Sequence, residues 1–362
     1  MDRISDKIKI LYTIPNFNTA GSGKVVYDLA KGLNKEKFDV EIACGNAKGS
    51  FFAEIEKLGL PIHIMPTTVP LRPYLNLLFR IKPFQSFVKQ HHFDIVHSWN
   101  WSSDWSEVIA SRLAGAQFIY TKKAMTWGNI HWKIKSYLTN FILTINDEMK
   151  SYFPNKKNQD LIPLGLDTNY YNPDLFPKKE EQGVFKIITV ANLVPVKAIE
   201  VLIEAIHKLN DSSVYLDILG DDTTEYAREL REVIEKFKLE KQISFLGKHI
   251  DVRPFLAQSD LYVIPSKKEG LGMALVEAMA MGIPVLGSNI SGINFVLKDF
   301  PEFLFEVSNV EVLSAEIKKI AQKQPSERNE IGQQLRKYCI DHYSLENMIS
   351  KHEDLYLKLA RK

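Results

Sequence analysis

The chain has 362 residues, of which 45% are hydrophobic and 25% charged, and it contains two cysteines, Cys44 and Cys339. This composition is typical of a folded globular protein and excludes a largely disordered chain. The cysteine count excludes a disulfide framework and argues against a zinc site. No run of about 18 apolar residues occurs, which excludes a membrane-spanning helix. Because the first residues lack the layout of a secretory leader, we expect a cytoplasmic protein.

The net charge of +2 is unevenly distributed along the chain. Residues 1–178 contain 22 Lys and Arg against 16 Asp and Glu, whereas the remainder contains 24 against 28. Most of the excess lies between residues 60 and 140, at Arg72, Arg80, Lys82, Lys89, Arg112, Lys122, Lys123, Lys133 and Lys135. Such a surface is either simply solvated or attracts an anion, for example an anionic membrane or a phosphorylated ligand.

Short apolar runs alternate with helical stretches in the first half of the chain. The runs that we predict as buried strands are Ile8–Ile14, Val40–Ala43, Ile62–Met65, Ile95–His97, Phe118–Thr121 and Phe141–Ile145. Apolar residues at three- and four-residue spacing predict helices over Val25–Leu33, Phe51–Leu58 and Leu75–Gln90. A repeating order of strand, helix and strand predicts a parallel, doubly wound α/β sheet.

The pattern lapses between Asn155 and Gly183, where prolines and the charged run at 178–181 predict a linker. A second alternating series follows. Its predicted strands are Lys186–Ala191, Val214–Leu219, Ile243–Leu246, Leu261–Ile264 and Pro284–Leu286. Its predicted helices are Ile199–Leu209, Glu225–Phe237, Val252–Gln258 and Gly272–Met281.

We therefore predict two Rossmann-like domains, formed by residues 1–178 and 179–343. Residues 344–362 read as an amphipathic helix, which we expect to pack back on the first domain. Ligands of open parallel sheets bind at the carboxyl ends of the strands. Two such sheets facing across a cleft would therefore place the functional residues in the loops between strands and helices.

The most informative of these loops follows the predicted strand Leu261–Ile264. It contains Glu269, Gly270 and Gly272, and the helix that follows carries Glu277. The first turn of a helix has unpaired backbone N–H groups that can bind phosphate oxygens, and glycines allow a ligand to approach the backbone. The alternative is that Glu269 and Glu277 are ordinary charges near a helix N-terminus. Against this, Glu277 lies on an otherwise apolar helix, where an unpaired charge is costly.

With its flanking residues, this segment resembles the E-x7-E signature of the retaining glycosyltransferases of family 4, which have the GT-B architecture of two Rossmann-like domains. The resemblance implies an N-terminal acceptor-side domain and a C-terminal domain that binds a nucleotide sugar. It implies that Glu269 is catalytic and contacts the donor sugar, and that Glu277 holds the ribose. Backbone amides at Gly270, Leu271, Gly272 and Met273 would bind the donor diphosphate.

A second loop, residues 191–198, follows the first strand of the second domain. The family places an Arg and a Lys here to contact the diphosphate, and Lys197 matches the Lys, whereas Asn192 stands at the Arg position. Losing one cationic contact could cost several kcal/mol unless another group compensates. Candidates for compensation are Lys122, Lys123 and Lys268. The alternative for Lys197 is a surface lysine at a helix start.

A third loop, residues 15–24, resembles the family's glycine-rich turn, in which Gly21 and Gly23 would approach the donor phosphate. The alternative is a purely structural turn. The ending Gly23-Lys24-Val25 lacks the Ser or Thr of a Walker A motif, which disfavours nucleoside triphosphate hydrolysis.

Residues 94–99 resemble the family's D-x-V-H-x-H strand end, with His97 retained and Trp99 in place of the second His. His97 is a candidate catalytic residue that would reach the sugar hydroxyls, or it is a buried core imidazole. Residues 162–167 resemble the I-P-N-G-V-D hinge, with Leu164 in place of Asn.

The resemblance thus implies a metal-independent, retaining transfer without a cofactor, and we expect it to run from a UDP- or GDP-linked sugar to a glycan or lipid-linked acceptor in surface polysaccharide synthesis. Neither a covalent intermediate nor a same-face displacement is excluded. We expect no nucleic-acid partner. Basic amphipathic stretches at 71–89 and 129–143 predict peripheral contact with an anionic membrane. Alternatives are a non-catalytic binding or scaffold homologue, motivated by Asn192, Trp99 and Leu164, or another GT-B enzyme such as a phosphorylase or epimerase.

Overall fold

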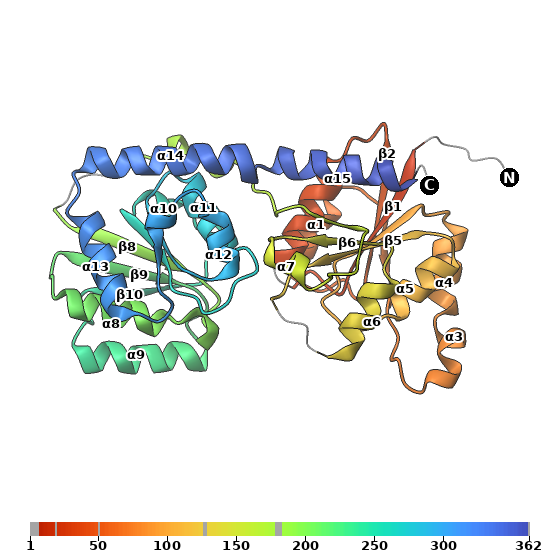
Figure 1. The fold of residues 1–362 in the computed structure, drawn as a ribbon, viewed down its shortest axis with the longest axis horizontal. Coiled ribbons are helices and arrows are strands. Elements are labelled where there is room, and N and C mark those ends of the chain that lie inside the picture. Colours follow the sequence, from red (N-terminus) through yellow and green to blue (C-terminus); the bar gives the residue numbers. More distant parts are fainter. Residues whose placement is uncertain (1–6, 19, 50, 126–128, 178–182, 361–362) are drawn as a thin grey trace. The chain divides into compact units, whose positions relative to one another are not determined.

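A computed structural model describes residues 7–18, 20–49, 51–125, 129–177 and 183–360. The chain divides into two compact units. Unit 1 comprises Met1–Gly165 and Leu345–Lys362, and unit 2 comprises Leu166–Ser344 (Figure 1). The division falls at Gly165, whereas the boundary predicted at residue 178 and the charged run at 178–181 lie outside the described residues.

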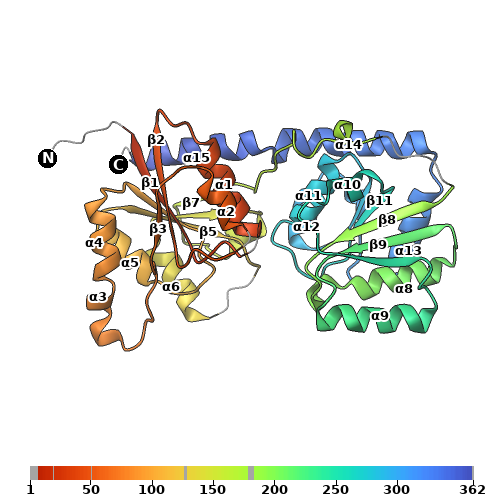
Figure 2. The same ribbon diagram turned by 180° about the vertical axis from the view of Figure 1, so that it is seen from behind.

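Unit 1 is built on a seven-stranded parallel sheet with the strand order β3-β2-β1-β4-β5-β6-β7 (Figure 2). The strands are β1 (Ile8–Ile14), β2 (Phe38–Cys44), β3 (Ile62–Ile64), β4 (Ile95–Ser98), β5 (Gln117–Lys122), β6 (Phe141–Thr144) and β7 (Gln159–Leu161). Parallel strands that are covered on both faces are buried along their length, and β1, β2, β4, β5 and β6 each contain at least four consecutive buried residues. The chain winds outward in both directions from β1 and β4, which confirms the predicted doubly wound topology.

Helices cover both faces of this sheet and form two apolar layers. The helices of unit 1 are α1 (Ala20–Gly32), α2 (Phe52–Glu56), η1 (Tyr74–Asn76), α3 (Leu77–Arg80), α4 (Lys82–Gln90), α5 (Ser106–Leu113), α6 (Ile130–Leu138), α7 (Glu148–Ser151) and α15 (Leu345–Ala360). One layer joins α1 to α15, which inserts Met348, Leu355, Tyr356 and Leu359. The other layer joins α3, α4 and α5 to the opposite face.

Unit 2 is a six-stranded parallel sheet in the order β10-β9-β8-β11-β12-β13. Its strands are β8 (Phe185–Val190), β9 (Val214–Leu219), β10 (Ile243–Gly247), β11 (Leu261–Ile264), β12 (Val285–Ser288) and β13 (Leu304–Phe305). Its helices are η2 (Pro173–Leu175), η3 (Pro195–Lys197), α8 (Ile199–Leu209), α9 (Glu225–Phe237), α10 (Arg253–Ala257), α11 (Met273–Ala280), α12 (Ser291–Val296), η4 (Pro301–Phe303), α13 (Val310–Ala321) and α14 (Pro325–Tyr343).

Two helix predictions for unit 1 need correction. The helix predicted over 75–90 is broken into η1, α3 and α4, and α4 has Pro83 in its first turn, where the missing N–H is tolerated. The helix predicted from Val25 begins at Ala20, so Gly21 and Gly23 lie within α1 rather than in a loop. The rest of the third loop includes Thr19, which lies outside the described residues. In the part of the chain that the structure describes, no helix is long and apolar enough to cross a membrane.

Candidate active site

The loops after β8 and β11 leave adjacent strands in the middle of the unit 2 sheet. From β8 the chain continues to β9 and β10 on one side, and from β11 it continues to β12 and β13 on the other. Loops diverge at such a reversal of strand order, and ligands of open parallel sheets bind there. The two loops span residues 191–198 and 265–272, and they contain most of the residues that the sequence predicts for donor binding.

An ion pair links the two loops. Lys197 Nζ lies 2.5 Å from Glu269 Oε1, and the two side chains are 20% and 13% exposed. Ser266 Oγ donates a further hydrogen bond of 3.0 Å to the same carboxylate oxygen. The backbone N–H of Lys267 donates to the carbonyl of Val196 over 2.8 Å. The Glu269 carboxylate is therefore held in place by charge-assisted bonds at the mouth of the sheet.

The backbone of the turn before α11 is fixed by close packing. Gly272 has a φ of +79°, a left-handed conformation that favours glycine, and it caps α11. A Cβ added at Gly292, in the first turn of α12, would lie 2.4 Å from the carbonyl oxygen of Glu269. Ser288 Oγ donates to the carbonyl of Ser266 over 2.5 Å. As a result, the N–H groups in the first turn of α11 have a defined direction before any ligand binds.

Glu277 faces a tyrosine that the sequence analysis missed. The hydroxyl of Tyr171 hydrogen-bonds with the Glu277 carboxylate, and burial together with this carboxylate raises the pKa of Tyr171. The guanidinium of Arg253 lies over the neighbouring ring of Tyr170, 3.3 Å from the ring centroid. Arg253 in turn pairs with Asp251 at 2.7 Å. The only available signal was the position of Tyr171 just after the hinge-like segment 162–167.

A second tyrosine lies beneath the site, on β11. Tyr262 is fully buried, and within the described residues its hydroxyl has no hydrogen-bond partner. Burial raises the pKa of Tyr262, and the charges of Glu269 and Glu277 raise it further. A buried hydroxyl without a partner is costly.

The remaining candidates of unit 2 border this arrangement. Asn192 is exposed at the start of its loop. The backbone of the preceding residue, Ala191, packs closely on Gly220, because a Cβ added at Gly220 would lie 2.2 Å from the Ala191 carbonyl oxygen. Lys268 is exposed on the other loop. Lys267 forms an ion pair of 3.1 Å with Glu200, which also accepts a hydrogen bond from Tyr226. Gly270 is half-buried, Leu271 and Gly272 are buried, and Met273 begins the helix.

In unit 1, His97 lies at the end of β4 and is fully buried. Its Nδ1 lies 2.7 Å from the hydroxyl of Tyr356, and its Nε2 lies 2.7 Å from Oγ1 of Thr121. Burial lowers the pKa of His97 well below its usual value, with smaller contributions from His352 and Lys123. This geometry is that of the buried imidazole alternative, because both ring nitrogens already have protein partners.

Lysines gather at the carboxyl end of β5. Lys123 Nζ donates to Ser22 Oγ over 2.8 Å and to the carbonyl of Trp99 over 2.6 Å. Burial lowers the pKa of Lys123 to about 7 and that of Lys122 to about 8. Lys135, which is fully buried, donates to the carbonyl of Ser102 over 2.9 Å. Of these lysines, Lys123 lies beside Ser22 in the first turn of α1, which also holds Gly21 and Gly23.

Gly21 and Gly23 differ in their surroundings. A Cβ at Gly21 would meet nothing within 4 Å, whereas a Cβ at Gly23 would lie 3.0 Å from the Phe17 ring. Gly23 therefore has a packing role, and Gly21 is open to a ligand.

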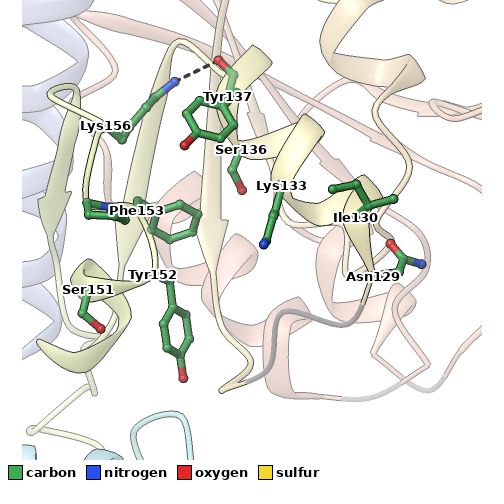
Figure 3. Close-up of a pocket in the computed structure, with 10 residues that line it drawn as sticks. Asn129, Ile130, Lys133, Ser136, Tyr137, Ser151, Tyr152, Phe153 and Lys156 are labelled. Atoms are coloured by element: carbon green, nitrogen blue, oxygen red, sulfur yellow. Dashed lines mark hydrogen bonds between the residues drawn. The ribbon is translucent and has the colours of Figure 1, made fainter.

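Two cavities lie elsewhere. One of about 660 Å³ in unit 1 is lined by Ile130, Lys133, Tyr137, Tyr152 and Lys156 among others, and Lys156 donates to the Tyr137 carbonyl there (Figure 3). Another of about 810 Å³ lies beside the amino ends of β8 and β9 in unit 2. Neither contains a residue that the sequence predicts for the site.

Comparisons with known proteins point to one family. Residues 172–338 match the family described as glycosyl transferases group 1, and residues 19–169 match glycosyltransferase family 4. A similar curated protein is the N-acetyl-alpha-D-glucosaminyl L-malate synthase of Bacillus anthracis, 27% identical over 60% of this chain and 58% of its own length. The chain thus spans less than two thirds of that relative. An Escherichia coli alpha-1,3-galactosyltransferase is 23% identical over 99% of both chains.

Among solved structures, a glycosyltransferase from Rickettsia africae has the same fold, with a TM-score of 0.87 at 21% identity over 98% of this chain and 99% of its own. The fold is therefore the GT-B type, with two parallel-sheet α/β domains. The two family matches follow one another and together cover most of the chain, which therefore belongs to glycosyltransferase family 4.

Proposed function

We propose that this protein is a retaining hexosyltransferase that moves a sugar from a nucleotide diphosphate sugar to a glycan or lipid-linked acceptor in surface polysaccharide or glycoconjugate biosynthesis. The observation that supports this most is the ion pair between Lys197 and Glu269, 2.5 Å long, beside the N-terminus of α11. It brings an anion, a cation and backbone N–H groups to one point of the sheet edge. A bound nucleotide sugar would use all three: the anion for its sugar hydroxyls, and the cation and the N–H groups for its diphosphate.

Each group has a role in this proposal. Glu269 accepts hydrogen bonds from donor sugar hydroxyls near the reacting carbon. Lys197 and the amides from Gly270 to Met273 bind the diphosphate, and they stabilise the negative charge that it gains as it leaves. Because these groups neutralise the diphosphate, the reaction as proposed needs no metal ion. We favour displacement from the same face of the sugar over a covalent intermediate, since Lys197 already occupies one oxygen of Glu269.

We assign the nucleotide ribose to Glu277. A carboxylate accepts hydrogen bonds from vicinal hydroxyls, and the hydroxyl of Tyr171 already fixes this one. The name of the Escherichia coli relative gives UDP-Gal as donor and alpha-D-GlcNAc-diphosphoundecaprenol as acceptor. On this basis we propose a UDP-linked sugar as the first donor to test, with a GDP-linked sugar as the second.

We propose that unit 1 binds the acceptor and contacts an anionic membrane surface. Leu75, Leu78 and Phe79 are 102%, 63% and 73% exposed on η1 and α3. Arg72 and Lys82 flank them and are also exposed. Apolar side chains bordered by basic ones are typical of helices that lie in the interface of an anionic bilayer.

A thermal-shift screen against uridine, guanosine and adenosine diphosphates and their sugars tests the proposal. A ligand that binds only the folded state raises the unfolding midpoint as its concentration exceeds Kd. We expect one class of nucleotide to raise the unfolding midpoint. The sugar of the corresponding nucleotide sugar should then be released by hydrolysis or transferred. Stabilisation without any turnover would instead support a binding or scaffold homologue, which the exposed Asn192 favours.

A further inference from the structure

Three potential metal ligands converge in unit 1. They are Glu41 in β2, His63 in β3 and His91 at the C-terminal end of α4. One ligand atom from each lies within 4.8 Å of the others. Among the residues that the structure describes, no other group of three His, Cys, Asp or Glu meets this condition. None of the three belongs to the transferase site proposed above.

The distances centre on one carboxylate oxygen. Glu41 Oε2 lies 2.6 Å from His63 Nε2 and 3.4 Å from His91 Nδ1. In a tetrahedral zinc site the ligand atoms lie about 2.0–2.2 Å from the metal and therefore roughly 3.3 Å from one another. The Glu41–His91 distance already has this value. The Glu41–His63 distance is shorter than this value, and His63 lies on a three-residue strand at the edge of the sheet.

The three side chains are shielded from solvent to different degrees. The Glu41 side chain is 8% exposed, and the side chains of His63 and His91 are 24% and 35% exposed. Lys9 Nζ lies 3.4 Å from the other carboxylate oxygen, Oε1, and donates to the carbonyl of His91. Oε2 is thus left to face the two imidazoles, while the half-exposed histidines leave a side of the group open to solvent. Supporting contacts of this kind orient metal ligands.

Aromatic rings hold both imidazoles in place. The His63 ring lies 4.7 Å from Phe87 and 5.1 Å from His91, centroid to centroid. The His91 ring lies 4.3 Å from Phe87 and stacks on Phe93 at 5.6 Å. The ligand nitrogens therefore converge on Glu41 from orientations fixed by packing, which lowers the cost of organising the site on metal binding.

We propose that Glu41, His63 and His91 bind a divalent transition-metal ion of the zinc type, with water as the fourth ligand. Two imidazoles and one carboxylate are a ligand set that Zn²⁺ uses when it keeps an open position. The ion would link β2, β3 and the end of α4, so its role is to stabilise unit 1. This site is independent of the sugar transfer proposed above, which uses no metal.

The test uses the full-length protein after treatment with EDTA and gel filtration. Titration with Co²⁺ should show one saturable site per chain with the visible absorption of a four-coordinate ion, and Zn²⁺ should displace it. The variants His91→Ala and Glu41→Gln should bind at least about tenfold more weakly, since even losing a group that only supports a ligand costs roughly that much. His92→Asn is the matched control, because His92 is the exposed neighbour of His91 and its left-handed φ of +54° suits asparagine.

Circular dichroism of each variant checks the fold, and the half-exposed His91 provides a test even if the buried Glu41 does not tolerate substitution. Two results would overturn the proposal: no saturable Co²⁺ binding by the unaltered protein, or binding that persists unchanged in folded His91→Ala. Either would leave His63 and Glu41 as a hydrogen-bonded pair without a metal ion. Since the readout is metal binding, neither result would affect the transferase assignment.

Discussion

The hydroxyl of Tyr356, near the end of the chain, lies 2.7 Å from Nδ1 of His97, and both side chains are fully buried. Tyr356 also meets the hydroxyl of Tyr12 at 3.1 Å. α15 therefore completes a polar network inside unit 1, in addition to packing its apolar face on α1. This network fixes His97. A denaturation experiment can therefore measure what the network contributes to stability, separately from any effect on catalysis.

We predict that Tyr356→Phe destabilises the protein by roughly 1–3 kcal/mol, because His97 Nδ1 and the Tyr12 hydroxyl lose a buried partner. Urea denaturation monitored by tryptophan fluorescence measures the change. Lys358→Ala, at an exposed neighbouring position, controls for damage to the helix. An unchanged midpoint in Tyr356→Phe would show that the hydroxyl is dispensable.

The buried side chain of His352 makes the free energy of unfolding depend on pH. It is buried, and burial lowers its pKa to about 4, whereas in the unfolded chain the value is near 6.5. Between pH 4 and 6.5 the unfolded state binds more protons, so stability falls as pH falls through this window. We predict that His352→Gln reduces the slope of the unfolding free energy against pH by up to about 1.4 kcal/mol per pH unit.

Denaturation midpoints between pH 4.5 and 7.5 provide the measurement. His97 has a lowered pKa too, so part of the slope should remain in His352→Gln. His92→Asn, at an exposed position, should keep the full slope. Equal slopes in His352→Gln and the unaltered protein would contradict the assignment.

The outline of this fold could be predicted from the sequence because it depends on local patterns. In unit 2, the predicted bounds of α8, β9, α9 and β11 match the structure. β7 and β13 were missed, since Gln159–Leu161 and Leu304–Phe305 are too short to show an apolar run. α1 was predicted to begin five residues late, because its first turn contains two glycines, which are poor helix formers.

Lys197 provides a test of the donor site. We predict that Lys197→Met lowers kcat/KM by about 10²–10³-fold, because one preorganised cation is lost from the leaving diphosphate. Lys197→Arg should retain part of the activity. Lys268→Met, an exposed lysine on the partner loop, is the control and should keep most of it. Loss of activity in Lys268→Met with none in Lys197→Met would reverse the two roles.

Membrane contact is tested by flotation with vesicles that contain anionic lipid. We predict that the protein floats with these vesicles and not with neutral ones, because basic residues surround the exposed Leu78 and Phe79. Leu78→Ser with Phe79→Ser should remove most of the flotation, because burying each of these apolar side chains contributes about 1.5–3 kcal/mol. Ile250→Ser, an exposed apolar residue in unit 2, is the control. Absence of the unaltered protein from both vesicle fractions would exclude this surface.

The candidate site could be predicted only in part. Glu269 and Lys197 lie in strand-to-helix loops, and Glu277 lies on the helix that follows one of these loops, all at positions that match the family signature, so the sequence indicated them. The partners that orient them are distant in the chain: Lys197 meets Glu269 across 72 residues, and Tyr171 meets Glu277 from the segment before β8. The two nitrogens of His97 are occupied by Tyr356 and Thr121, and no periodicity along the chain reveals such pairings.

The most direct test of the transferase assignment is the turnover of Glu269→Gln with the donor that the thermal-shift screen identifies. Glutamine keeps the size of the side chain but removes the charge that pairs with Lys197. The assignment predicts a loss of transfer of at least about 10²-fold, as for other preorganised transition-state contacts, while circular dichroism and nucleotide-induced stabilisation persist. Full turnover by a folded Glu269→Gln protein would contradict it.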